Sequence, residues 1–292
     1  MDGFWLATET ILNSSFSISE AENMKITFLG TGTSIGVPEI GCTCKVCRST
    51  DPRDRRMRCS ALVDSAGGTR ILMDCGPDFY QQMQTVDYRR IDGVLITHEH
   101  FDHTGGLDDL RPFCRFGDVD IWLDAYTAGH LRERLPYFFK EKLYPGVARL
   151  RLHETEPGDV FMVGDVRVMP LRVRHGQLPI LGYRMDAADG TSIGYITDMS
   201  DCPEETVDVL CGRTEETKDN GVVDTLVVNA LRMEPHPSHE CLAEAIRFAR
   251  RVGARQTRFV HFSHGIGLHA ETNAQLPHDM QLAYDGMISL GD

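Results

Sequence analysis

Apolar and polar residues alternate along the chain in short runs that predict many β-strands and few long helices. The runs at Lys25–Leu29, Arg70–Met73 and Gly93–Thr97 are short, largely apolar, and bounded by glycine or polar residues, as buried strands are. Further strands are predicted at Ser60–Ser65, Asp120–Leu123, Val160–Val163, Val166–Val173, Leu181–Met185, Thr191–Thr197, Thr225–Val228 and Thr257–Val260.

Three other segments show helical rather than strand periodicity. One begins at Leu107, and a second covers Ala128–Leu135. The third spans His239–Val252, and Ser238 is expected to cap its N-terminus. Its apolar residues recur at the spacing of one helix face: Leu242, Ala245, Ile246, Ala249 and Val252.

Because strands outnumber helices, the pattern predicts an α+β fold in which two stacked sheets are flanked by helices. The chain has 292 residues, of which 41% are apolar, and this is enough to bury the core of one domain at 24–292. Residues 1–23 are rich in Ser, Glu and Asn and are expected to form a poorly ordered N-terminal tail. They contain no Lys or Arg, which argues against a signal peptide with a basic start, and no apolar run reaches transmembrane length.

The formal charge of −13 at pH 7 limits the kinds of partner that the protein is expected to bind. So acidic a chain is not expected to present a broad surface to nucleic acid or to an anionic membrane, although a local basic pocket could hold a phosphate. Nine cysteines without a secretion signal favour free thiols in a reducing compartment, so we expect a cytoplasmic protein. A homodimer is the default expectation for a soluble oligomer of this kind.

The segment Thr97–His103 concentrates metal-ligating side chains at the end of a predicted strand. It reads Thr-His-Glu-His-Phe-Asp-His and directly follows an apolar run. Imidazole nitrogen and carboxylate oxygen are ligands that suit Zn, Mn and Fe. The first two histidines can serve one metal, while Asp102 and His103 serve a second. The alternative is a polar loop that happens to be rich in histidine.

This H-x-H-x-D-H pattern after a strand resembles the metallo-β-lactamase superfamily, and the resemblance implies a four-layer αββα sandwich. The superfamily carries further site residues at the ends of other strands, in a fixed order along the chain. This sequence offers a match for each of them after a predicted strand: Asp74, His175, Asp198 and His261. Taken singly, Asp198 could be a helix cap and His175 a loop histidine, but their order favours the metal interpretation.

The resemblance also implies how the ligands divide between two divalent catalytic ions, Mn or Zn. It assigns His98, His100 and His175 to one ion and Asp102, His103 and His261 to the other, with Asp198 bridging both. Two dications about 3.5–4 Å apart stabilise the attacking and the leaving oxygen, and they lower the pKa of bound water to about 7. The nucleophile would then be a metal-bridging hydroxide rather than a side chain.

A second pattern, Cys42-Thr43-Cys44-Lys45-Val46-Cys47, offers three thiolates to one tetrahedral ion. His264 lies three residues beyond His261 and fits the fourth position, so we expect a structural zinc. This cysteine cluster resembles the phosphoribosyl cyclic phosphate phosphodiesterase branch of the superfamily, as do the pairs Arg55-Arg56 and Tyr284-Asp285. The alternative is an incidental cluster of core cysteines.

His239, at the start of the predicted third helix, matches by resemblance the histidine that contacts the scissile phosphate and protonates the leaving oxygen. A helix N-terminus would help to hold an anion there and would lower the pKa of the imidazole. The alternative is a loop histidine like its neighbour His236. Asn229 and Arg232 follow a buried strand and could touch phosphate, but they could equally pair with the acidic surface, so they stay outside the predicted site.

The sequence therefore predicts a binuclear metal hydrolase that cleaves a small phosphodiester, such as phosphoribosyl 1,2-cyclic phosphate. A ribonuclease Z-like endonuclease that processes transfer RNA is the main alternative, but the chain lacks a basic, Gly/Pro-rich substrate arm. A thioesterase or lactamase of the same superfamily would not explain the cysteine cluster. An alternative from a different functional class is a zinc-stabilised binding module without catalytic activity.

Overall fold

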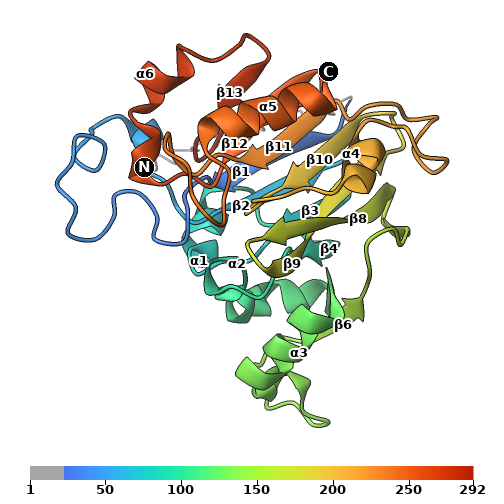
Figure 1. Cartoon of the computed structure of the whole chain (residues 1–292). Coiled ribbons are helices and arrows are strands. Elements are labelled where there is room, and N and C mark those ends of the chain that lie inside the picture. Colours follow the sequence, from blue (N-terminus) through green and yellow to red (C-terminus); the bar gives the residue numbers. More distant parts are fainter. Residues whose placement is uncertain (1–22, 292) are drawn as a thin grey trace, which may run out of the picture.

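Two seven-stranded β-sheets packed face to face form the body of the protein (Figure 1). The computed structural model describes residues 23–291, so the expected tail lies outside the described residues except for Asn23. Helices cover the outer face of each sheet, which confirms the predicted αββα sandwich. None of the helices within residues 23–291 is both long and apolar enough to cross a membrane.

The first sheet comes mainly from the N-terminal half of the chain. It contains β1 (Lys25–Gly30), β2 (Ser60–Asp64), β3 (Arg70–Met73), β4 (Gly93–Leu95), β5 (Val119–Leu123), β6 (Leu150–Glu154) and β14 (Ile288–Leu290). Their order is β14-β1-β2-β3-β4-β5-β6. Pairing is antiparallel from β14 to β3 and parallel from β3 to β6.

The second sheet repeats this plan with the C-terminal half. It contains β7 (Phe161–Val163), β8 (Val166–His175), β9 (Leu178–Ala187), β10 (Ser192–Ile196), β11 (Thr225–Asn229), β12 (Gln256–Val260) and β13 (Met280–Leu282). Their order is β13-β12-β11-β10-β9-β8-β7. Pairing is antiparallel from β7 to β10 and parallel from β10 to β13.

Alternation along the strands fills three apolar layers. In β2, Ala61 and Val63 belong to the layer between the sheets, whereas Leu62 belongs to the layer on the outer face. Across the inner layer, Tyr183 and Tyr195 of the second sheet are fully buried. Every strand predicted from the sequence is present within a few residues of its expected ends, while β6, β13 and β14 were not predicted.

Short helices connect and cover the sheets, with α5 on one side and α1, α2 and α3 on the other (Figure 1). The α-helices are α1 (Phe79–Gln82), α2 (Phe101–Thr104), α3 (Ala125–Arg134), α4 (Glu204–Leu210), α5 (Leu242–Val252) and α6 (His269–Asn273). The 3₁₀ helices are η1 (Pro52–Asp54), η2 (Met83–Thr85), η3 (Leu107–Phe116), η4 (Pro136–Phe139) and η5 (His264–Ile266). The helix predicted from Leu107 is thus the 3₁₀ helix η3, and it contains Pro112, which cannot donate a backbone hydrogen bond.

The predicted start of the third long helix is wrong. Helix α5 begins at Leu242, and its N-cap is Cys241 rather than Ser238. The residue before the cap is held in an extended connection, because Glu240 N donates to Met199 O at 2.9 Å and Leu231 N donates to Glu240 O at 2.9 Å. The carbonyl of Glu240, which an earlier helical turn would need as an acceptor, is thus engaged by Leu231.

Candidate metal centre

The residues predicted to bind or support metal follow the carboxyl ends of five strands. In the first sheet, Asp74 follows β3 directly and His98 lies three residues beyond β4. In the second sheet, His175 ends β8, Asp198 lies two residues beyond β10, and His261 follows β12 directly. Because neighbouring parallel strands end at the same edge of a sheet, residues distant in sequence meet there.

Three of these residues leave their strands through a left-handed backbone conformation. The φ angles are 56° at Asp74, 58° at Asp198 and 60° at His261, and no other non-glycine residue of the described chain has a positive φ. Such a conformation costs a residue with a side chain roughly 1–3 kcal/mol. The coincidence of all three with the predicted site indicates that side-chain placement there outweighs local backbone preference.

His98, His100 and His175 form the first ligand group, with ligating nitrogens within 4.8 Å of one another. His98 Nε2 lies 2.9 Å from His100 Nδ1. His175 Nδ1 donates to Ser238 O at 2.8 Å, which leaves Nε2 for a metal. Burial, together with the charge of His103, lowers the pKa of His98 well below its usual value, so His98 is neutral, as a ligand must be.

A second group of four buried residues adjoins the first: Asp102, His103, Asp198 and His261. Its ligand atoms also lie within 4.8 Å of one another. Asp198 Oδ1 is 3.1 Å from His261 Nε2, and Asp198 Oδ2 is 3.3 Å from His103 Nε2. Asp102 Oδ2 is 3.1 Å from His103 Nε2. The two carboxylates and two imidazoles therefore converge on one small volume.

The polar atoms of this second group fit a bound cation. Within the described chain, His103 Nε2 and both ring nitrogens of His261 are buried without a hydrogen-bond partner. Leaving such atoms unpaired is costly, and a divalent ion would satisfy His103 Nε2 and one ring nitrogen of His261 while neutralising the two carboxylates. Imidazole and carboxylate together suit Zn, Mn or Fe. The fold of the chain implies divalent metals, and these residues fit them.

The local field of the second group also favours positive charge. Burial disfavours the protonated form of His103, but the carboxylates of Asp102 and Asp198 outweigh burial and raise its pKa well above the usual value. Burial likewise disfavours the Asp198 carboxylate, yet the rings of His261 and His103 hold its pKa well below the usual range. The carboxylates that favour a proton on His103 would equally favour a divalent cation at this place.

His239 lies beside both groups. Its ligating nitrogen is within 4.8 Å of those of His175 and Asp198, and its Nδ1 is 3.8 Å from Asp198 Oδ1. Its ring stacks on that of His261, with centroids 5.1 Å apart. Burial and the charge of His261 lower the pKa of His239 to about 3. Since α5 starts three residues later, this shift does not come from the predicted helix N-terminus.

Asn229 supports the site in a way that the sequence did not reveal. The side chain is fully buried at the end of β11, which pairs with both β10 and β12. Asn229 Oδ1 accepts from Met199 N at 2.7 Å, and Nδ2 donates to Met199 O at 3.0 Å. It therefore fixes the residue after Asp198 rather than touching phosphate. Asn229 ends an apolar strand that lies, in sequence, between the strands leading to Asp198 and His261. This position is the sequence feature that could have identified its role.

Arg232, the other residue considered for phosphate contact, is engaged with the backbone. Its Nε donates to Glu234 O at 3.1 Å and its Nη2 donates to Pro235 O at 2.7 Å. It stabilises the loop that leads to His239, which is a structural role.

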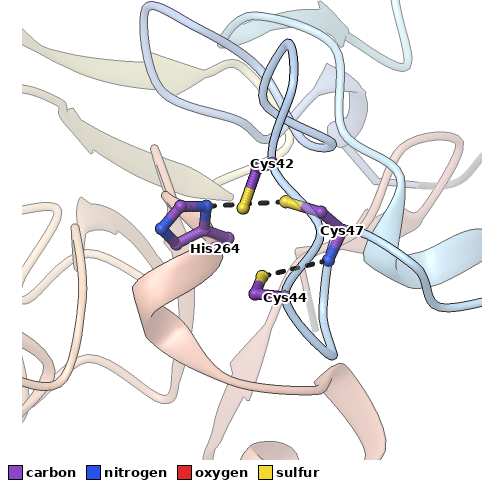
Figure 2. Close-up of side chains that lie close together, drawn as sticks. All are labelled: Cys42, Cys44, Cys47 and His264. Atoms are coloured by element: carbon purple, nitrogen blue, oxygen red, sulfur yellow. Dashed lines mark hydrogen bonds between the residues drawn. The ribbon is translucent and has the colours of Figure 1, made fainter.

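The cysteine cluster and His264 come together as predicted (Figure 2). Cys47 Sγ lies 3.5 Å from His264 Nδ1, and the backbone N–H of Cys47 donates to Cys44 Sγ at 3.4 Å. This N–H lowers the pKa of Cys44, while burial raises the pKa of Cys47 to about 11. Cys42 completes the group, and none of these thiols forms a disulfide. Three sulfurs and one imidazole suit a closed tetrahedral zinc site.

Arg56 links the residue after β1, the residue after β13 and the residue after His261. Its guanidinium is buried and lies 4.4 Å from the ring centroid of Phe262, the residue after His261. It donates to Thr31 Oγ1 at 2.8 Å and to Ala283 O at 2.7 Å. Asp285 accepts from Thr31 N at 2.9 Å in the same network. The predicted motifs around Arg56 and Asp285 therefore form one structural unit.

Comparisons with known proteins agree with this geometry. A family model described as "Beta-lactamase superfamily domain" matches residues 69–262. The crystal structure of a new diphosphatase from the PhnP family has a TM-score of 0.80 and 36% sequence identity, covering 91% of this chain and 96% of that one. The chain therefore belongs to the metallo-β-lactamase superfamily and, within it, to the PhnP family. The PhnP-family structure is that of a diphosphatase, and the two ligand groups of this chain fit the metals of such an enzyme.

Curated relatives carry several different names. The chain is 40% identical over 270 residues to an octanoyltransferase of Porphyromonas gingivalis, covering 92% of this chain and 52% of that protein. It is 34% identical over 179 residues to a ribonuclease Z of Thermosynechococcus vestitus, covering 57% of this chain and 37% of that protein. The chain thus spans about half the length, or less, of these relatives, and their names do not assign its substrate.

Proposed function

We propose that the protein hydrolyses a phosphodiester, and that the substrate is a small cyclic phosphate such as phosphoribosyl 1,2-cyclic phosphate. The observation that carries this proposal is the meeting of two ligand groups at Asp198, with His239 beside them. Displacement at phosphorus requires stabilisation of the attacking and leaving oxygens and a proton for the leaving group. The similarity to a PhnP-family diphosphatase supports chemistry at phosphorus.

The metal assignments follow the two groups. His98, His100 and His175 would hold one ion and Asp102, His103 and His261 the other, with Asp198 between them. When bound, a pair of divalent ions, Mn or Zn, supplies Lewis acidity that polarises the phosphoryl oxygens and makes water reactive near neutral pH. Cys42, Cys44, Cys47 and His264 would hold a structural zinc.

The remaining chemistry belongs to side chains of the protein. Both carboxylate oxygens of Asp198 contact the second group, Oδ2 at His103 and Oδ1 at His261. A ligand atom of Asp198 also lies within 4.8 Å of that of His175 in the first group, so Asp198 would keep the spacing of the two groups fixed. His239 would carry the proton that the leaving oxygen of the cyclic diester needs when its ring opens. The negative charge of a bound phosphate favours the protonated imidazole, so substrate binding would help to charge this acid.

Two other activities remain candidates. Similarity to ribonuclease Z favours processing of transfer RNA, but a net charge of −13 argues against a surface that grips RNA. Similarity to an octanoyltransferase makes thioester hydrolysis worth testing. The non-catalytic binding module is set aside, because the chain belongs to a family of hydrolases and all the expected ligands lie in the two groups.

Nine free cysteines also support a reducing compartment, and we expect the cytoplasm. The single domain at 24–292 and the homodimer stay predictions.

The decisive assay is hydrolysis of phosphoribosyl 1,2-cyclic phosphate by protein reconstituted with Mn or Zn, with metal content measured in parallel. Asp198→Ala should abolish turnover, whereas Asp219→Ala, at an exposed loop position, should not change it. No turnover by metal-loaded wild-type protein would refute the substrate assignment. Precursor transfer RNA and an octanoyl thioester, assayed with the same preparations, would then identify which alternative holds.

A further inference from the structure

The proposed proton donor lies on the loop 230–241, which connects β11 to α5. The backbone anchors this loop near both ends. Leu231 O accepts from Ser263 N at 2.8 Å, and Glu240 N donates to Met199 O at 2.9 Å. Both partners come shortly after ligands of the second group in the sequence. The two ends of the loop are therefore fixed to segments that also hold the metal centre.

The middle of the loop lies over open space. A cavity of about 320 Å³ is enclosed between Ser200, the loop residues around His239 and one face of α5. Residues 233–235 are exposed to solvent on the other side. Loops with few packed contacts open most easily, so other contacts must hold the backbone that carries the His239 ring.

Arg232 supplies such contacts from within the loop. Its Nε donates to Glu234 O at 3.1 Å, and its Nη2 donates to Pro235 O at 2.7 Å. A guanidinium presents its N–H groups in a fixed fork, so one side chain holds two successive carbonyls. Arg232 O also accepts from Leu242 N at 2.9 Å, at the start of α5. The residue thus fixes the course of the chain between the strand and the helix.

The stem of Arg232 packs against the segment that carries His261 and His264. Gly265 makes this approach possible, since a Cβ added there would lie 3.0 Å from Arg232 Cβ, closer than ordinary van der Waals contact. Gly265 O also accepts from Met233 N at 3.1 Å. His264 faces the cysteine cluster (Figure 2). Arg232 therefore rests on a segment that joins the second ligand group to this cluster.

We propose that Arg232, beyond stabilising the loop, is a positioning residue that directs the His239 imidazole at the leaving oxygen. The assignment rests on the proposed function, in which His239 carries the proton for that oxygen. His239 Nδ1 lies 3.8 Å from Asp198 Oδ1, so a small shift of the loop would change its place relative to the reacting phosphate. Misplacing a catalytic group by about 1 Å can cost roughly 100-fold in rate. Because Arg232 bonds to backbone carbonyls, its effect on the reaction is exerted through His239.

Two substrates with different leaving groups test this role. Phosphoribosyl 1,2-cyclic phosphate releases an alcohol oxygen, which needs a proton, whereas bis(p-nitrophenyl) phosphate releases p-nitrophenolate, which is stable as an anion. Arg232→Met keeps the aliphatic stem but loses the donors. In the metal-loaded enzyme it should lower kcat for the cyclic substrate about tenfold or more and change kcat for the aryl substrate less than about threefold, with KM little altered. Arg232→Lys, which keeps a donor, should show the same selective loss to a smaller extent.

A double-mutant cycle separates positioning from a general structural role. His239→Asn should lower kcat selectively for the cyclic substrate. Adding Arg232→Met should then lower it by less than about a further twofold, because the group that Arg232 positions is already gone. Arg250→Met is the control, since Arg250 is exposed on α5, and it should leave both substrates as in the wild type.

Metal content and thermal unfolding, measured on every variant, exclude loss of an ion or of the fold as the cause, and Arg232→Lys carries the test if Arg232→Met does not fold. Equal losses on both substrates, or losses that multiply with those of His239→Asn, would overturn the positioning role. A selective loss in His239→Asn alone would do the same and leave the proposed function intact. A metal-loaded wild type that does not cleave the cyclic substrate would refute the proposed function, and the positioning role with it.

Discussion

His103 and Asp74 form a hydrogen bond in the fully buried floor of the site, with His103 Nδ1 2.7 Å from Asp74 Oδ2. The carboxylate accepts, so Nδ1 carries the hydrogen and Nε2 faces the acidic residues of the second group. Thr97 N donates to Asp74 Oδ1 at 2.8 Å. One carboxylate therefore fixes the orientation of a ligand and the turn that bears the H-x-H-x-D-H motif.

Asp74→Asn tests this support. Asparagine tolerates the left-handed conformation of Asp74, so the turn should persist while the negative charge is lost. Metal affinity of the second group should fall about 10–100-fold, as for other outer residues that orient a histidine ligand. Competition with a chelator measures this affinity, and a value within twofold of the wild type would contradict the role. Asp219→Asn, on the exposed loop, is the control.

Asn229→Ala should destabilise the protein and impair the site together. The substitution removes two hydrogen bonds to Met199 and leaves buried backbone groups unpaired. The free energy of unfolding should fall by roughly 1–3 kcal/mol. Urea denaturation measures this change, and Asn220→Ala at an exposed position should show none. Wild-type stability in Asn229→Ala would show that the amide does not hold the turn after Asp198.

Cys44→Ser should remove the structural zinc and also lower activity. His264 lies three residues beyond His261, so loss of the ion frees the loop that carries a ligand of the second group. We expect one zinc fewer per chain and a roughly tenfold or greater loss of kcat. Elemental analysis and kinetics on the same sample check both. Cys211→Ser, a half-buried thiol outside the cluster, should keep the full metal content.

Asp285 should make stability depend on pH in an unusual direction. Burial raises the pKa of its carboxyl from 3.8 to about 6, against the hydrogen bonds from Met57 and Thr31. The folded state therefore binds the proton more tightly than the unfolded chain, and this contribution to stability is lost as the pH rises from about 4 through about 6. Urea midpoints across this window should fall less steeply in Asp285→Asn than in the wild type. Parallel slopes would show that Asp285 does not titrate there.

Local pattern predicted most of the strands, because those strands alternate between two apolar layers. It missed β6, β13 and β14 for a physical reason. The latter two have three residues each with a polar residue in the middle, whereas the equally short β4 and β7 lie in continuous apolar runs. Strand β6 carries exposed polar residues. These strands form through backbone pairing with a neighbour, as Asp120↔Arg151 and Phe259↔Leu282 illustrate. Such pairing depends on partners that are distant in sequence.

The candidate ligands could be predicted because clusters of His, Asp and Cys residues at such close spacing are rare in sequences. The start of α5 could not, since it is set by bonds from Glu240 to Met199 and Leu231. The cavity beside His239 was equally hidden, because it joins Ser200, a loop and one face of a helix. For Asn229, phosphate and the acidic surface were the partners considered, whereas its side chain binds the backbone of Met199. An amide side chain at the end of a strand can contact either substrate or backbone. Which of the two it contacts becomes clear only from the folded turn after Asp198.

Each sheet contributes only part of the metal centre, and this division has a consequence for the unfolding rate of the protein. The first sheet supplies the ligands of the H-x-H-x-D-H motif, while His175, Asp198 and His261 come from the second. The complete centre therefore exists only after the sheets have docked, late in folding. Interactions absent from the transition state slow unfolding without accelerating folding. Metal should thus lengthen the lifetime of the native state while the refolding rate stays the same.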